Sequence, residues 1–271
     1  MNSITSFIKR YPQAVFWAIA WSTFFFGYFM YVQTRSNIWQ LLILGPFLGG
    51  ILVTGIADGR SGLKTYFSRI VRWRVHIKWY AVALFLPFVL WLAAFGLTVA
   101  SGAETIVNPE WVWGDILFEM IIVVFVISLG EEPGFRGFAL PRLLNGRSAL
   151  KASLILGVFH AIWHLPLFIT GAQPPIVFLV ILAGAVLNTW LFNNTNGSVL
   201  LAMIMHTSVD FQVYLFRPLF TEADAVTQTY WLVAAYVVTA VILLLVTGKD
   251  LSRKQEIQSE AGMAESKLAV N

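Results

Sequence analysis

The chain has 271 residues, of which 58% are hydrophobic and only 12% are charged. A soluble domain of this size carries about 25% charged residues, so the composition excludes an ordinary globular fold in water. The formal net charge of +4 comes without a basic domain interleaved with aromatic residues, and we expect no nucleic-acid partner. Because cysteine is absent, disulfides, thiolate metal sites and a cysteine nucleophile are excluded as well.

Apolar runs long enough to cross a bilayer recur along almost the whole chain. A hydrocarbon core of about 30 Å needs roughly 20 apolar residues in helical conformation. The first run follows Lys9 and Arg10 and is too long for a signal-peptide core, so we expect it to be retained. The sequence predicts an all-α polytopic membrane protein, a bundle of about eight transmembrane helices. They are expected over residues 15–32, 38–56, 79–99, 116–143, 152–169, 176–192, 198–216 and 230–246, the fourth being long and interrupted.

Lysine and arginine are distributed unevenly between the loops. With the N-terminus in the cytoplasm, all of the 18 basic residues except Arg35 and Arg217 fall on the cytoplasmic side. The positive-inside rule describes this bias. We therefore expect a multi-pass protein of the cell (inner) membrane with both termini in the cytoplasm.

The fourth predicted span contains two adjacent carboxylates, Glu131 and Glu132, followed by Pro133 and Arg136. Ionisable groups inside a bilayer are costly, rare and usually face a cavity or one another. Glu132 and Arg136 stand at the i, i+4 spacing that allows an ion pair, whereas adjacent residues point about 100° apart on a helix. We infer that Glu132 pairs with Arg136, that Glu131 is left free to act as a general base, and that Pro133 kinks the span beside them.

Three of the four histidines also fall inside predicted spans. His160 and His164 share one face of the fifth span, and His206 shares a face of the seventh with Asp210, because each pair has i, i+4 spacing. Three separate helices thus bring titratable groups to similar depths. One shared cavity is the most economical explanation.

These residues carry a resemblance to a known family. The run EEPGFRGF resembles the EExxxR motif of the CPBP family of intramembrane glutamate proteases, which includes the type II CAAX prenyl-protein processing enzymes and the bacterial Abi, or bacteriocin self-immunity, proteins. His164 in FHAIWHLPLF resembles the histidine of the second motif, and His206 with Asp210 matches the third, HxxxN or HxxxD. The motifs stand in the family's order, and the resemblance covers about residues 42–216.

The resemblance implies peptide-bond hydrolysis without a covalent intermediate, and we expect no cofactor. Carried over by position, Glu131 and His164 would activate a water, while His206 and Asp210 would stabilise the oxyanion. The substrate would be a membrane-embedded or lipidated peptide or protein. Four segments follow: an N-terminal cytoplasmic segment and first span (1–40), the CPBP-like protease core (41–218), the last span (219–247) and a flexible cytoplasmic tail (248–271).

Two residues depart from the family's pattern. His160 stands where an aromatic residue usually precedes the second-motif histidine, with Phe159 one position early, so His160 is either a spare ligand or a supporting partner. Asp210 stands where many members have asparagine. Because an ionised aspartate would repel an oxyanion, Asp210 must be protonated or must orient His206 instead.

Three other functions stay open. Glu131, His164 and His206 could hold a tetrahedral zinc in a metal-dependent variant of the same protease, although no HExxH motif is present. A proton-coupled transporter could use the same residues as a relay. Against it stand the lack of a clear internal repeat and the clustering at one depth. The third is a non-catalytic scaffold.

Overall fold

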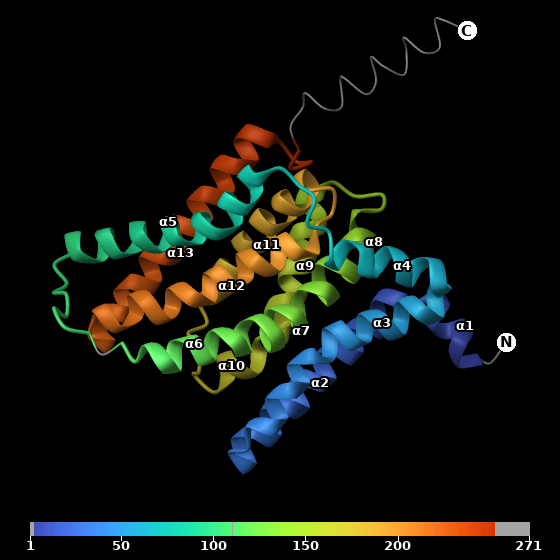
Figure 1. Ribbon diagram of the computed structural model, residues 1–271, viewed down its shortest axis with the longest axis horizontal. Coiled ribbons are helices and arrows are strands. Elements are labelled where there is room, and N and C mark those ends of the chain that lie inside the picture. The colour runs from blue at the N-terminus through green and yellow to red at the C-terminus, as the bar shows by residue number, and fades with distance from the viewer. Residues whose placement is uncertain (1–2, 110, 253–271) are drawn as a thin grey trace, which may run out of the picture.

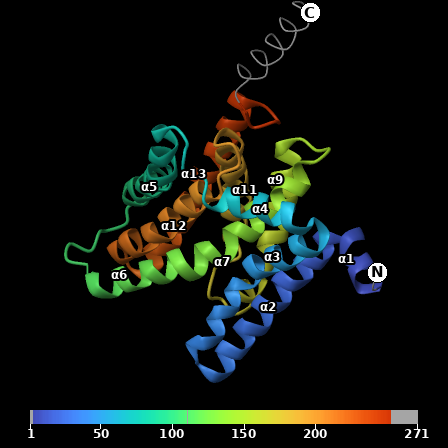
Figure 2. The same ribbon diagram turned by 45° about the vertical axis from the view of Figure 1, so that its right-hand side comes forward.

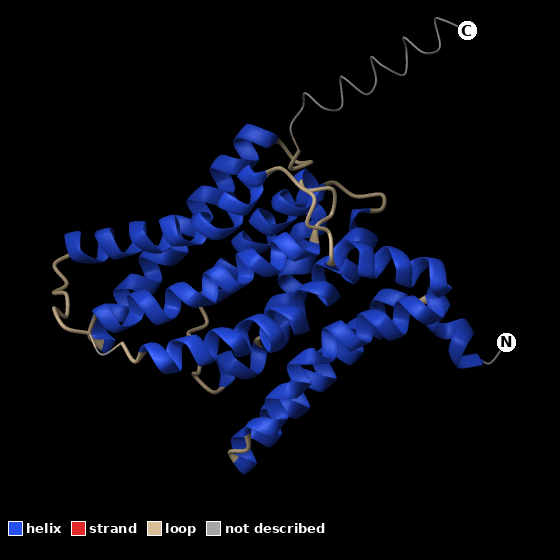
Figure 3. Ribbon diagram, viewed as in Figure 1, coloured by secondary structure: helices blue, strands red, loops and turns tan. Residues whose placement is uncertain are grey.

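The computed structural model describes residues 3–109 and 111–252, and every regular element in them is helical (Figure 3). In chain order the elements are α1 (Ser3–Arg10), α2 (Pro12–Thr34), η1 (Asn37–Leu44), α3 (Gly45–Ala57), α4 (Gly59–Ile70), α5 (Ile77–Ala100), α6 (Trp113–Ile122), η2 (Val123–Ser128), α7 (Leu129–Glu132), η3 (Pro133–Ala139), α8 (Leu140–Leu144), α9 (Ala149–Trp163), α10 (Leu165–Ile169), α11 (Val177–Asn194), α12 (Val199–Phe216), η4 (Arg217–Leu219) and α13 (Glu222–Thr247). The expected flexible tail lies, from residue 253 onward, outside the described residues.

Within the described residues, seven helical stretches are long and apolar enough to cross a membrane: Pro12–Thr34, Asn37–Ala57, Ile77–Ala100, Trp113–Leu144, Val177–Asn194, Val199–Leu219 and Glu222–Thr247. The predicted class, an all-α multi-pass membrane protein, is confirmed. The fifth predicted span, over residues 152–169, is not one continuous helix, because α9 ends at Trp163 and α10 follows a break at His164. Pro166, in the first turn of α10, has no N–H to continue the α9 hydrogen-bond ladder.

The fourth span is interrupted, as the sequence predicts, but its irregularity is a pair of wide turns. The short α-helical stretch α7 contains Glu131 and Glu132 and lies between the π-helical segments η2 and η3. Pro133, which removes one backbone donor, begins η3. Single π-helical turns within α-helices occur frequently at functional sites, and here two of them flank the carboxylates.

Two hydrophobic clusters hold the bundle together. One joins α5, α11, α12 and α13, and the other joins α2, α3, α4, η3, α8 and α9. In Figures 1 and 2 the helices α2 and α3 run side by side along one flank, while α5, α12 and α13 form the opposite flank. The helix with the two carboxylates lies between these groups, where α3, η1 and α12 all contact it.

Two glycines let the second span approach this helix closely. A Cβ atom added to Gly130 would lie 2.7 Å from the carbonyl oxygen of Ile43, and one added to Gly134 would lie 2.6 Å from the backbone of Pro46. No side chain fits at either distance without a shift of the neighbouring backbone. These contacts seat the carboxylate pair firmly against η1 and α3.

Candidate active site

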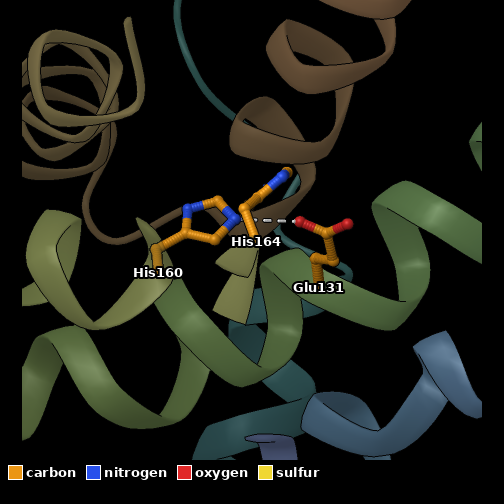
Figure 4. A group of neighbouring side chains, drawn as sticks. All are labelled: Glu131, His160 and His164. Atoms are coloured by element: carbon orange, nitrogen blue, oxygen red, sulfur yellow. Dashed lines mark hydrogen bonds and ion pairs between the residues drawn. The ribbon is translucent and has the colours of Figure 1, made fainter. Parts of the chain in front are cut away.

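Glu131, His160 and His164 converge on one point in the bundle. The two histidines come from α9 and its C-terminal cap, and Glu131 comes from α7 (Figure 4). His160 Nε2 lies 3.1 Å from Glu131 Oε2, and one ligand atom from each of the three residues lies within 4.8 Å of the others. The His160 ring also packs on Phe135, with ring centroids 4.4 Å apart. Glu131 therefore has a fixed partner.

Glu132, the next residue of α7, points in another direction and forms a second group. Arg136 Nη1 donates to Glu132 Oε1 at 2.8 Å, so the ion pair inferred from the i, i+4 spacing is confirmed. His206 Nδ1, from α12, donates to the same oxygen at 2.8 Å. Glu132 and Arg136 are 1% and 2% exposed, and the charge of each is compensated within the protein.

Asp210 lies beside the other nitrogen of the His206 ring. Its Oδ2 atom is 3.5 Å from His206 Nε2, so the imidazole stands between the carboxylates of Glu132 and Asp210. Of the two possibilities for Asp210, that it is protonated or that it orients His206, this geometry favours the second. A histidine held by a carboxylate through one nitrogen has its other nitrogen aimed in a set direction.

Gln173, in the loop between α10 and α11, holds His164. Its Oε1 atom lies 3.0 Å from His164 Nδ1 and accepts the proton of that nitrogen. The hydrogen bond selects the tautomer in which Nε2 keeps its lone pair. Sequence reasoning missed Gln173, since no motif or helical spacing relates it to His164.

A cavity of about 380 Å³ opens onto these groups. Glu131, His164, His206 and Asp210 all line it, whereas His160 lies behind Glu131 and is 7% exposed. The four residues proposed from the sequence as catalytic thus share one cavity. Its remaining walls are mostly aromatic and aliphatic side chains: Phe24, Tyr28, Tyr31, Trp39, Leu42, Ile43, Val123, Ile127, Trp163, Leu167, Val213 and Tyr214.

The structure groups some of these residues differently from the sequence-based expectation. The zinc set was expected to be Glu131, His164 and His206, but among the described residues the group close enough to hold a metal is Glu131, His160 and His164. The helical spacing pairs Glu132 with Arg136 and His206 with Asp210, yet Glu132 and His206 are also hydrogen-bonded to each other. The physical reason is that Glu132 Oε1 has two lone pairs and accepts from Arg136 and His206 together.

The fold and the buried cluster define a multi-pass membrane protein with glutamate and histidine side chains gathered around an internal cavity. The family model of the type II CAAX prenyl endopeptidase Rce1-like proteins matches residues 113–212, which contain all the glutamates and histidines of this cluster. The chain is also 25% identical over 202 residues to CAAX prenyl protease 2 of Methanococcus maripaludis, covering 66% of this chain and 74% of that protein. Residues 113–212 thus match the Rce1-like type II CAAX prenyl endopeptidase (CPBP) family, a family of endopeptidases, and the resemblance stated from the motifs is confirmed.

Proposed function

We propose that the protein is an intramembrane endopeptidase that hydrolyses a peptide bond of a membrane-associated substrate with a water activated by Glu131 and His164. The observation that carries this proposal is the position of the Glu131 carboxylate, bound to His160 on one side and facing the cavity with His164 on the other. We infer that the protein resides in the cell membrane with both termini in the cytoplasm, since the basic residues concentrate on one side. The substrate is an embedded or lipidated peptide or protein.

The reaction needs only groups of this chain and water. Glu131 takes a proton from a water held between its carboxylate and the free Nε2 of His164, and the hydroxide attacks the scissile carbonyl carbon. Glu132 orients His206 through the Nδ1 atom, and the Nε2 atom, which lies 3.5 Å from Asp210, donates to the carbonyl oxygen as negative charge develops there. The proton on Glu131 then passes to the leaving nitrogen, which yields a carboxylic acid and an amine. Asp210 orients the His206 ring.

Single substitutions test the proposal. We expect Glu131→Ala and His164→Ala each to reduce cleavage by at least about 100-fold, because a positioned acid or base contributes 10²–10⁴-fold. New peptide termini are compared by proteomics in membranes that contain the wild-type protein, either variant or neither. Both variants must still insert and remain monodisperse in detergent. Retained turnover in both would refute the assignment.

The group formed by Glu131, His160 and His164 favours one alternative, a zinc-dependent form of the same protease. Zinc bound there would polarise the water and remove the need for a free carboxylate base. We expect cleavage to resist chelators and the purified protein to lack stoichiometric zinc. Zinc at one ion per chain that is lost in His160→Ala, together with activity, would establish the alternative instead.

A further inference from the structure

The cavity that leads to Glu131 extends toward one end of the bundle. Its outer residues lie at the end of the bundle that is farther from α1. They are Tyr31 near the C-terminal end of α2, Gln40 in η1, Gln173 in the loop before α11 and Tyr214 near the C-terminal end of α12. Glu131, His164 and His206 lie at its inner end. In Figure 1 the connection from α5 to α6 is at this same end of the bundle, and α4 with the connection into α9 is at the other.

Packed side chains close the other end. Between Glu131 and the α4 end of the bundle lie the rings of Phe16, Trp17, Phe135 and Phe138, each at most 2% exposed. The ring of Phe16 stacks on Phe138 with centroids 4.6 Å apart, and that of Trp17 stacks on Phe135 at 5.4 Å. Interiors packed in this way leave no passage for a peptide. The cavity therefore gives no access to Glu131 from the α4 end, and its mouth near Tyr31 and Gln40 lies on the opposite side.

The closed end is also the basic end. The connection from α3 to α5 and the connection from α8 to α9 contain many of the lysines and arginines, whereas Arg35 and Arg217 are the only two basic residues that the sequence places at the open end. Basic loops stay in the cytoplasm. We propose that the cavity opens to the outer face of the membrane, and that the enzyme cleaves polypeptides anchored in the outer leaflet. This proposal rests on the proposed function for the cleavage and on the charge distribution for the direction.

The walls indicate the chemistry of the substrate. Among the described residues that line the cavity, none is lysine or arginine, and the ionisable groups are two carboxylates and two histidines. A free terminal carboxylate would find no cation of fixed charge there. Aromatic walls such as Tyr28, Tyr31 and Trp39 suit an extended apolar segment instead. The substrate is an apolar stretch within a membrane-anchored polypeptide.

Single cysteines test the direction, since the chain contains none of its own. Gln40→Cys marks the mouth, Ala172→Cys marks an exposed loop at the same end, and Lys64→Cys marks an exposed residue of α4. A polyethylene-glycol maleimide that cannot cross membranes is added to right-side-out and to inverted vesicles. We expect the first two to react in right-side-out vesicles and the third in inverted vesicles. The reverse pattern would overturn the proposal whether or not the protein cleaves peptides.

The same reagent tests the route of the substrate. In right-side-out vesicles, we expect labelling of Gln40→Cys to reduce the amount of cleavage product at least tenfold relative to unlabelled protein. Labelling of Ala172→Cys should leave the amount of product unchanged. Unchanged cleavage in modified Gln40→Cys would overturn this route. If the labelling pattern is as expected but wild-type protein cleaves nothing in either vesicle, the proposed hydrolysis fails while the outward opening stands.

Discussion

The Nδ1 atom of His206 lies 2.8 Å from Oε1 of Glu132, and this oxygen is the one that also receives Arg136. If Glu132 only neutralised the charge of Arg136, His206 would have no hydrogen-bond acceptor for its Nδ1 proton. Glu132 instead links a buried charge pair to the histidine on α12. The second glutamate of the motif is therefore both a structural and a positioning residue.

We predict that Glu132→Gln destabilises the protein and slows catalysis. Arg136 would keep its charge in a buried site with no carboxylate, and breaking a buried pair in this way costs about 3–5 kcal/mol. Thermal unfolding in detergent measures the loss. Glu104→Gln, at an exposed position, is the matched control and should leave the transition unchanged. An unchanged transition in Glu132→Gln would contradict the role of the pair.

His160 is predicted to act through Glu131. Replacing it with leucine frees the carboxylate to rotate, and misplacement of about 1 Å costs up to about 100-fold in rate. His160→Gln can still donate from its amide nitrogen, and we expect it to retain most of the rate. Steady-state kinetics should show the loss in kcat with KM nearly unchanged. Equal loss in both variants would mean that His160 fills space and does not position the carboxylate.

Gln173 is predicted to hold the His164 tautomer. Gln173→Leu removes the acceptor of the Nδ1 proton, and the ring is then free to rotate or to change tautomer. We expect kcat to fall between about 10- and 100-fold. Gln40→Leu changes another glutamine of the same cavity that has no contact with a histidine, and its kcat should fall less than twofold. Similar values for the two variants would argue against the assignment.

Gly134→Ala is predicted to destabilise the bundle. The added methyl group would lie 2.6 Å from the Pro46 backbone, and such overpacking costs about 1–3 kcal/mol. Gly96→Ala provides the comparison, because its Cβ would meet no atom within 4 Å. Thermal unfolding should separate the two substitutions, with Gly96→Ala neutral or slightly stabilising. The reverse order would show that η3 moves away from α3 easily.

Helical spacing predicted the contacts between residues of the same helix, and the structure confirms them. It could not predict the contacts between residues of different elements. The i, i+4 rule placed Arg136 on Glu132 correctly and brought Asp210 close to His206. It says nothing of which residue on another helix His206 meets, so the bond to Glu132 was not expected. Gln173 reaches His164 through a loop whose path depends on tertiary packing.

Hydropathy has a similar limit for the spans. Residues 152–169 are apolar enough to be read as one helix, because hydropathy averages over the backbone break at His164. That break is local chemistry, set by Pro166, and it lets His164 lie beside the shorter helix α9. The division of the chain into four segments (1–40, 41–218, 219–247 and 248–271) stays a prediction.

The wide turns η2 and η3 give the fourth span a surplus of backbone on each side of its two glutamates. Removing one residue from such a turn restores ordinary α-helical winding and leaves the residues beyond it facing the same way, whereas removing one from a regular α-helical turn rotates everything beyond it by about 100°. A deletion in the regular helix α6 would turn Glu131 away from His160 with no chemical group of the site altered, whereas η2 can lose one residue and keep Glu131 facing His160. The number of residues in the regular turns of this span is therefore as much a part of the site as their identity, and the wide turns are where the span can change its length without moving the carboxylates.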